Sequence, residues 1–201
     1  ARCSTIVFAN VLALMTSLTD NETIRFQWSS EQGFDTSCGY SAAVALMDTW
    51  WNIPVTELEL LTATAEAETG DEDFMVSFRS LSDLLASYGF AVKAYKMDWK
   101  QLKAAAEKYA PVLVHFDGYM GHFGLVLGFD EDTAIVADPA EGTRFATKDE
   151  FEGKWSGNVL LAVHPGKKRN DTKLARAIAD TASRMDVLER ASRPAAYARF
   201  R

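Results

Sequence analysis

The chain has 201 residues, of which 48% are hydrophobic and 24% are charged, values that indicate one globular domain, or one domain with an appendage, and argue against a disordered, collagenous or membrane-bundle protein. Its net charge of −7 is uneven, because residues 166–201 carry +6 and residues 1–165 carry −13. An acidic body without a basic patch argues against nucleic acid as a partner.

The N-terminal segment, residues 1–26, leaves two interpretations open. Its apolar part, 5–18, follows Arg2 as in the remnant of an export signal, and it is too short for a comfortable membrane span. The same part is equally compatible with a buried helix. A polar turn at 19–23 then leads to 24–28, whose alternating residues predict a short strand.

The apolar run 42–51 predicts a buried central helix. Apolar residues recur in it at intervals of three and four, and no proline or glycine interrupts residues 40–52, so we expect a helix over about 38–51. The apolar positions are Ala43, Leu46, Met47 and Trp50.

Cys38 is expected at the first turn of this helix, because Thr36 and Ser37 before it are N-cap residue types. A thiol there lies near unpaired backbone N–H groups and the positive end of the helix dipole, which favour the thiolate. An inert buried cysteine is the alternative. Gln32 favours a nucleophile, because a side-chain amide shortly upstream can bind an oxyanion beside the Cys38 N–H.

Caps, turn residues and periodicity predict the remaining elements. We expect a helix from Pro54 through Leu61, with Leu58, Leu60 and Leu61 buried, followed by an exposed loop at 65–73. A second helix should begin at Ser80 or Ser82 and run through Tyr88, and a third should run from the capping box of Asp98 and Gln101 to Tyr109. A short helix should begin with Thr147 and Glu150 and end near Trp155. Strands are expected at 90–95, 112–116, 123–129, 133–137, 144–146 and 159–163. Helices first and antiparallel strands second make an α+β domain.

The basic C-terminal part, 166–201, follows a linker predicted at 165–170. It contains an apolar stripe at helical spacing, which predicts a helix of about five turns. The stripe consists of Leu174, Ile178, Ala182, Met185 and Leu188. Such a stripe must be covered, either by the body, by a second copy of the chain or by a partner protein.

A base for the thiol is sought among the three histidines, His115, His122 and His164. His122 begins a strand after a glycine-rich loop, where its side chain can face a cleft, although a structural histidine is the more common outcome for one position. If 122–130 and 133–138 form a hairpin, Asp138 comes close to His122 and can fix its tautomer. An ordinary Asp-Pro turn is the alternative for Asp138.

The motifs of cofactor chemistry are missing from the sequence. It has no glycine-rich nucleotide motif and no zinc-spaced pair, and its two cysteines, Cys3 and Cys38, are too few for a four-cysteine zinc site or a disulfide framework. We therefore expect neither a metal nor a cofactor.

Three motifs in order resemble a known family. Gln-x5-Cys-Gly before an apolar helix, His-Phe followed by Gly-Phe-Asp, and Ala-Asp-Pro-Ala-x-Gly resemble the bacterial bacteriocin-processing C39 peptidases over about residues 27–163. The resemblance implies a papain-like fold, with the nucleophile helix packed on the C-terminal sheet. It also implies Cys38 as nucleophile, His122 as general base and acid, Asp138 as orienting carboxylate and Gln32 as oxyanion donor.

The resemblance further implies function and domain organisation. Residues 27–165 would form a peptidase domain, and 1–26 and 166–201 would lie outside it. This domain would cut a peptide or protein substrate in an extended leader after Gly-Gly. Large side chains would narrow the site, with Trp50, Trp51, Tyr119 and Phe123 as candidates by position, each equally compatible with a core role. The stretch Gln-Gly-Phe-Asp-Thr-Ser-Cys-Gly is most similar to a stand-alone exported branch of the family, which includes proteases of functional-amyloid systems.

Several alternatives stay open at this point. A periplasmic or exported location is expected, with the cytoplasm as the alternative, and an oligomer is compatible with the sequence. The C-terminal helix could contact a secretion-system component. A peptidase-like module that binds a secreted or amyloid substrate without cutting it, and acyl transfer in place of hydrolysis, are the competing functions.

Overall fold

The computed structural model describes residues 21–67, 76–118 and 121–192 of the chain. The described strands form one antiparallel sheet of six strands in the order β1-β6-β2-β3-β4-β5. The strands are β1 (Ala91–Lys96), β2 (Val112–Phe116), β3 (His122–Asp130), β4 (Thr133–Asp138), β5 (Gly142–Thr147) and β6 (Trp155–Val163). The helices are α2 (Asn21–Arg25), α3 (Cys38–Val44), the π-helix η1 (Ala45–Trp50), α4 (Glu57–Ala67), α5 (Phe78–Ser87), α6 (Trp99–Tyr109), α7 (Lys148–Glu152) and α8 (Asp171–Ser192).

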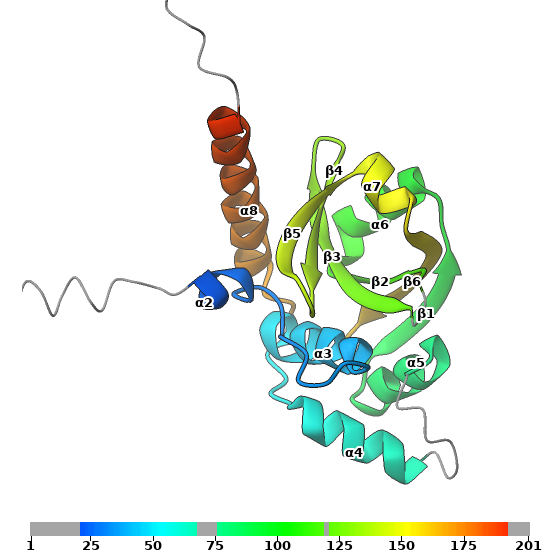
Figure 1. Cartoon of the computed structure of the whole chain (residues 1–201). Coiled ribbons are helices and arrows are strands. Elements are labelled where there is room, and N and C mark those ends of the chain that lie inside the picture. The colour runs from blue at the N-terminus through cyan, green and yellow to red at the C-terminus, as the bar shows by residue number, and fades with distance from the viewer. Residues whose placement is uncertain (1–20, 68–75, 119–120, 193–201) are drawn as a thin grey trace, which may run out of the picture.

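The helices α3, α4 and α5 lie together against one end of the curved sheet (Figure 1). α3 contacts β3, α4 and α5, and α5 also contacts β1 and β6. α6 and α7 pack on other parts of the sheet, and α8 stands along β5. The α+β prediction, with the nucleophile helix packed on an antiparallel sheet, is therefore confirmed.

The predicted central helix over 38–51 is confirmed as α3 followed directly by η1. Its apolar positions are fully buried, and the Trp50 ring stacks on Trp28 with centroids 6.2 Å apart. A π-helical turn is often found close to functional sites. Burial of this helix fixes the position of its first residue, Cys38.

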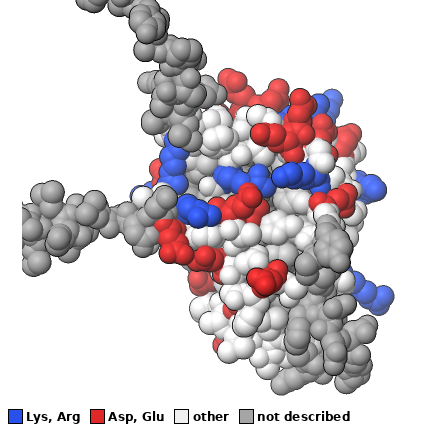
Figure 2. Space-filling view, viewed as in Figure 1, with Lys and Arg blue, Asp and Glu red and all other residues white. Residues whose placement is uncertain are grey.

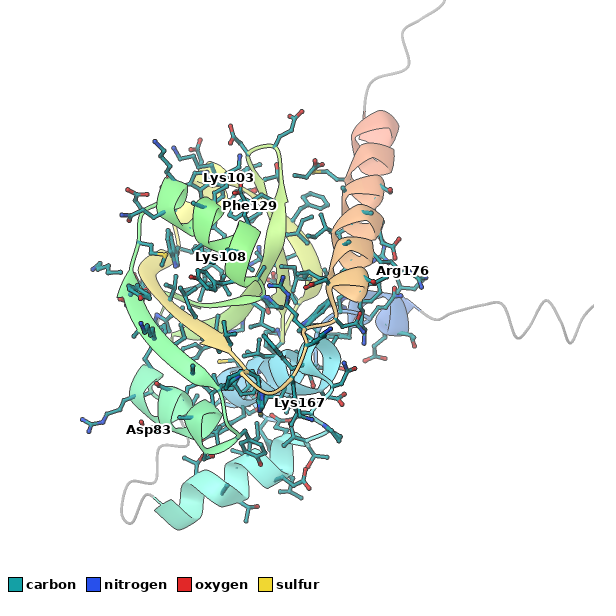
Figure 3. The ribbon with its side chains drawn as sticks, turned by 180° about the vertical axis from the view of Figure 1, so that it is seen from behind. Asp83, Lys103, Lys108, Phe129, Lys167 and Arg176 are labelled. Atoms are coloured by element: carbon teal, nitrogen blue, oxygen red, sulfur yellow. The ribbon has the colours of Figure 1, made fainter. Side chains whose placement is uncertain are left out.

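A network of aromatic residues joins the sheet to α6 and α7. Trp99 of α6 makes edge-to-face contacts with Phe129 of β3 and Phe151 of α7, with centroids 5.0 and 5.3 Å apart. Lys103, also on α6, lies with its ammonium 6.0 Å from the centre of the Phe129 ring, as can be followed from behind in Figure 3. These contacts hold β3, the strand that begins with His122.

The strand predicted at 24–28 is wrong, because this region contains α2 and then a turn. The helix has Glu22 in its first turn and Arg25 in its last, as its dipole favours. Its position depends on distant residues, since the Arg25 side chain donates to the carbonyl oxygen of Glu141 and Arg184 of α8 donates to that of Ile24. A five-residue alternation was too short to predict a strand against such contacts.

Two predicted helix starts are also wrong. α4 begins at Glu57 rather than Pro54, because the Thr56 hydroxyl accepts from the Glu59 N–H while the Glu59 carboxylate accepts from the Thr56 N–H. α5 begins at Phe78, with Ser77 as the N-cap. Of the leucines expected to be buried in α4, Leu58 is 67% exposed. The predicted loop 65–73 is helical to Ala67, and the rest lies outside the described residues.

The other predicted elements agree with the structure to within a few residues. Both expected capping boxes are present, Asp98 with Gln101 and Thr147 with Glu150. β6 begins at Trp155, four residues before the predicted strand, and the short helix before it ends at Glu152.

The C-terminal helix α8 packs on the body of the same chain. Leu174, Ala177 and Thr181 are buried, and α8 contacts β3, β4, β5 and η1. The Asn170 N–H before it donates to the Trp50 carbonyl oxygen at 2.8 Å. Within the described side chains, the body thus covers the apolar stripe as far as Ile178, while Leu188 lies outside them.

No helix within the described ranges combines the length and the apolar character that crossing a membrane requires. The apolar segment 5–18, together with Cys3, lies outside those ranges.

Candidate active site

Cys38 is the first residue of α3 and carries a free, half-buried thiol. The Ser37 side chain before it does not cap the helix, because its hydroxyl donates to the Phe34 carbonyl oxygen and accepts from the Phe34 N–H. The His122 side chain and the backbone of Phe123 and Gly39 lie beside the thiol and favour its ionised form. The sequence prediction of a cysteine at the first helical turn is confirmed.

His122 begins β3 and lies between Cys38 and Asp138. Its Nε2 is 2.9 Å from Oδ1 of Asp138, which leaves Nδ1 as the ring nitrogen available to the thiol. Asp138 ends β4, and the β3–β4 hairpin places Asp138 in contact with His122. In this hairpin Leu125 pairs with Ala137, the residue before Asp138. The structure therefore brings Cys38, His122 and Asp138 together, and the contact of His122 with Asp138 is the one that the hairpin argument predicted.

The pKa values of this trio are shifted by burial and by the contacts within it. Burial raises the pKa of the Cys38 thiol, but hydrogen bonds and the charge of His122 outweigh burial, and the pKa is lowered. Burial likewise lowers the pKa of His122, yet its bonds to Asp138 and Cys38 raise it to about 9. Both shifts favour the thiolate–imidazolium pair over the neutral thiol and imidazole.

Asp138 has several partners besides His122 and is 1% exposed. Its Oδ1 accepts from the Ala140 and Glu141 N–H groups at 2.9 and 3.1 Å, and Nη2 of Arg144 is 3.5 Å from Oδ2. Burial raises the pKa of Asp138, but the His122 and backbone contacts lower it overall. Arg144 was not predicted from the sequence, since a lone arginine on a strand carries no signal of this contact.

Gln32 is not brought into contact with the trio among the described residues. Its Nε2 donates to the carbonyl oxygens of Phe34 and Asp35 at 3.1 and 3.4 Å, and its Oε1 is buried without a hydrogen-bond partner there. The two acceptors fix the orientation of the amide, because a flipped amide would point oxygen at oxygen. To reach an oxyanion, the amide must release at least one of these carbonyls.

A cavity of about 140 Å³ opens beside the thiol. It is lined by Asp35, Thr36, Cys38, Val76, Ser77, Phe78, His115, Gly121, His122 and Phe123. Of the predicted wall residues, Phe123 lines it, Trp50 and Trp51 are buried in the core, and Tyr119 lies outside the described residues.

His115 is the second histidine of this cavity and was assigned no role from the sequence. Its ring contacts the edges of Phe78 and Phe123, with centroids 5.7 and 5.0 Å apart. Burial lowers the pKa of His115, the nearby Asp117 partly opposes this, and the charge of His122 lowers the pKa further. At neutral pH the His115 ring is therefore neutral, whereas the His122 ring is charged.

The described residues contain no group of three or more histidine, cysteine or acidic side chains arranged to hold a metal ion. On the face viewed in Figure 2, acidic and basic side chains are interleaved over the upper part of the described surface, and the lower part is largely uncharged.

Comparison with known proteins adds three findings. Residues 28–168 match the model of a family described as the Peptidase C39 family. A relative from Pseudomonas fluorescens named "Probable functional amyloid protease FapD" is 27% identical over 147 residues, which cover 71% of this chain and 63% of that protein. The match thus spans less than two thirds of the relative's own length.

Solved structures share the fold at low sequence identity. The peptidase domain of Streptococcus ComA, a bifunctional ABC transporter involved in quorum sensing, superposes with a TM-score of 0.60 at 16% identity, covering 68% of this chain and 98% of that domain. A double glycine motif protease from an AMS/PCAT transporter, in complex with its leader peptide, has a TM-score of 0.55 at 20% identity, covering 67% of this chain and 89% of that one. At such identities the likeness establishes the fold.

Proposed function

The chain belongs to the peptidase C39 family of double-glycine cysteine peptidases, and from this premise we propose that it is an endopeptidase whose catalytic residues are Cys38, His122 and Asp138. One observation carries the proposal. The His122 ring contacts Asp138 through Nε2 at 2.9 Å while it pairs with the Cys38 thiol, and its pairing with the thiol lowers the pKa of Cys38. A nucleophile, a base and an orienting carboxylate are the parts that thiol proteolysis requires.

The reaction begins when the Cys38 thiolate attacks the scissile carbonyl carbon. A tetrahedral oxyanion forms, and the His122 imidazolium then gives its proton to the leaving amine as the C–N bond breaks. The resulting thioester is hydrolysed by water, whose proton passes to the now neutral His122. Loss of the thiolate from the second tetrahedral intermediate restores the ion pair, while Asp138 keeps the ring oriented.

The oxyanion is stabilised by the Cys38 N–H and by the Gln32 amide in this proposal. Gln32 lies on the segment that leads into α3, a few residues before the thiol. Its Nε2 is bonded to the carbonyl oxygens of Phe34 and Asp35 in the free protein, so it becomes an oxyanion donor when one of these bonds is exchanged for the bond to substrate.

The cavity beside the thiol supports a substrate with small residues at the cut. It measures about 140 Å³, and the aromatic rings of Phe78 and Phe123 form part of its wall. Cleavage after Gly-Gly fits a narrow site, because glycine presents no Cβ to such walls. The leader peptide bound by the AMS/PCAT protease supports an extended leader as the class of substrate.

The name of the Pseudomonas fluorescens relative, a functional amyloid protease, supports a secreted protein as the source of this leader. On that basis we propose the periplasm or the cell exterior as the site of action. Fractionation of cells that express the tagged chain tests the compartment, and recovery only in the cytoplasm would contradict it.

Cleavage is tested with synthetic peptides that contain an internal Gly-Gly, using mass spectrometry to locate the cut. We expect the wild-type protein to cut after the second glycine, and Cys38→Ala and His122→Ala to lose activity by at least about 100-fold. Retained activity in either variant rejects the proposed catalytic residues. A wild-type protein that binds the peptides but leaves them intact would instead support the non-catalytic binding module.

A further inference from the structure

A single carboxylate connects the segment of Gln32 with the helix of Cys38. Glu57 is the first residue of α4, and its two carboxylate oxygens bind different elements. Oε1 accepts from the Ser41 hydroxyl at 2.9 Å, and Oε2 accepts from the Gly33 N–H at 2.9 Å. Glu57 thus bridges two parts of the chain that are separate in sequence.

Both contacts lie close to proposed catalytic groups. Ser41 is 0% exposed and lies about one turn after Cys38 on α3, so its hydroxyl is fixed to the helix of the nucleophile. Gly33 directly follows Gln32. A Cβ at Gly33 would lie 2.9 Å from Oε2 of Glu57, so glycine leaves the room that this close approach needs.

The other side of Gln32 is attached to the sheet. Its backbone N–H donates to the Pro139 carbonyl oxygen at 3.0 Å, one residue after Asp138. The Ser29 hydroxyl, further upstream, donates to the Asp138 carbonyl oxygen at 3.3 Å. Gln32 is therefore held between the end of β4 on one side and Glu57 on the other.

We propose that Glu57 is a positioning residue for the reaction, which fixes the Gln32 segment relative to Cys38 so that both oxyanion donors keep one geometry. The inference rests on the proposed function. Hydrogen bonds to an ionised carboxylate are stronger than those between neutral groups, so one side chain can hold both elements. Small displacements of catalytic groups cost large factors in rate, which gives such a tether a kinetic effect.

Glu59 provides a matched control on the same helix. It has the same charge, but within the described contacts its carboxylate accepts only from the backbone N–H and hydroxyl of Thr56. Replacing Glu59 therefore changes the cap of α4 and the local charge without touching Ser41 or Gly33.

The variants Glu57→Ala, Glu57→Gln and Glu59→Ala separate positioning from charge. In Glu57→Gln the amide oxygen can accept from the Gly33 N–H, and the amide N–H can donate to a reoriented Ser41 hydroxyl, so both links survive. Alanine removes both. We expect Glu57→Ala to lower kcat by about 10- to 100-fold with KM nearly unchanged, whereas Glu57→Gln and Glu59→Ala stay near wild type.

Two further measurements make the inference falsifiable. Alkylation of Cys38 by iodoacetamide should proceed at the wild-type rate in Glu57→Ala, because the thiolate–imidazolium pair is untouched. Hydrogen exchange of the segment 29–37 should rise in Glu57→Ala and stay unchanged in Glu59→Ala. Unchanged exchange, undiminished kcat, or alkylation that falls in proportion to kcat would each overturn the positioning role.

The proposed function fails separately. If the wild-type protein cuts no Gly-Gly peptide, the peptidase proposal is rejected together with the positioning role of Glu57. If the wild-type protein and Glu59→Ala both cut while Glu57→Ala cuts equally well, only the role of Glu57 is rejected.

Discussion

Burial alone would leave both Cys38 and His122 uncharged, because a medium of low polarity disfavours the thiolate and the imidazolium alike. The structure reverses both effects by placing the two groups in contact with each other and His122 in contact with Asp138, whose carboxylate is itself held by the Ala140 and Glu141 N–H groups. Charge separation at the site is therefore a property of the group of residues, and it should respond to pH as a unit.

The first prediction concerns this pH response. The pKa of Cys38 is lowered and that of His122 is raised to about 9, so both shifts favour the ion pair, and His122 keeps its proton up to about pH 9. Above that pH, His122 loses the proton that the leaving amine needs while the thiolate remains. We expect kcat/KM to fall above about pH 9 while the rate of Cys38 alkylation stays high, both measured over the same pH series.

Asp138→Asn provides the control for this prediction. The amide oxygen can still accept from the His122 ring, but the negative charge that raises the pKa of His122 is lost. We expect the alkaline fall in kcat/KM to move to lower pH and alkylation at pH 6 to slow. A profile that does not move would show that Asp138 does not set the charge of His122.

The three residues in contact could be predicted from the sequence because each has a local signal: a helix start for Cys38, a glycine-rich loop before His122, and a hairpin end for Asp138. Arg144 and Glu57 could not be predicted in this way. Both reach their partners across the tertiary fold, Arg144 from β5 to Asp138 and Glu57 from α4 to Ser41 and Gly33. On the sequence alone they resemble ordinary exposed charges.

At the scale of elements, the start of α3 is packed more tightly than its sequence suggests. A Cβ at Gly39 would overlap Cγ1 of Val76 and lie 3.1 Å from Cδ2 of Phe123. Phe123 also supplies a backbone contact to the thiol. Gly39 therefore allows α3 to approach β3 closely.

Gly39→Ala should consequently displace the first turn of α3. We expect it to lower the free energy of unfolding by about 1–3 kcal/mol and to slow Cys38 alkylation at neutral pH, as thermal unfolding and iodoacetamide kinetics would show. Gly118→Ala is the matched control, since a Cβ there meets nothing within 4 Å among the described atoms. Equal effects of the two substitutions would contradict the packing argument.

Elements with an amphipathic pattern or an unambiguous cap could be predicted, whereas those fixed by distant contacts could not. The capping boxes of α6 and α7 place both helix starts, because their two reciprocal hydrogen bonds are local. α2 is different. Five residues carry too little periodicity to decide between helix and strand, and its contacts come from Glu141 and Arg184, more than 100 residues away in sequence.

At the scale of the whole molecule, the family match ends at residue 168, yet the fold does not end there. α8 covers β3, with Cδ1 of Ile178 2.6 Å from where a Cβ of Gly128 would lie. The Arg184 side chain bonds to Ile24 and Gln27, on the other side of the matched segment. The free energy of unfolding therefore tests whether the peptidase domain predicted over residues 27–165 is stable without α8.

We predict that the chain depends on α8 for stability, and two single substitutions on this helix test it. Ala177 is 0% exposed against the body, whereas Ala179, two residues later, is exposed. Ala177→Asp buries an unpaired carboxylate and should lower the free energy of unfolding by about 3–5 kcal/mol, while Ala179→Asp should change it by less than about 0.5 kcal/mol. Urea unfolding of both variants gives these values directly.

A chain that ends at Pro165 should lose at least as much stability as Ala177→Asp, because every contact of α8 with the sheet is removed at once. If that shortened chain unfolds at the same urea concentration as the full chain, α8 is an independent appendage, and its apolar stripe is then free for a partner.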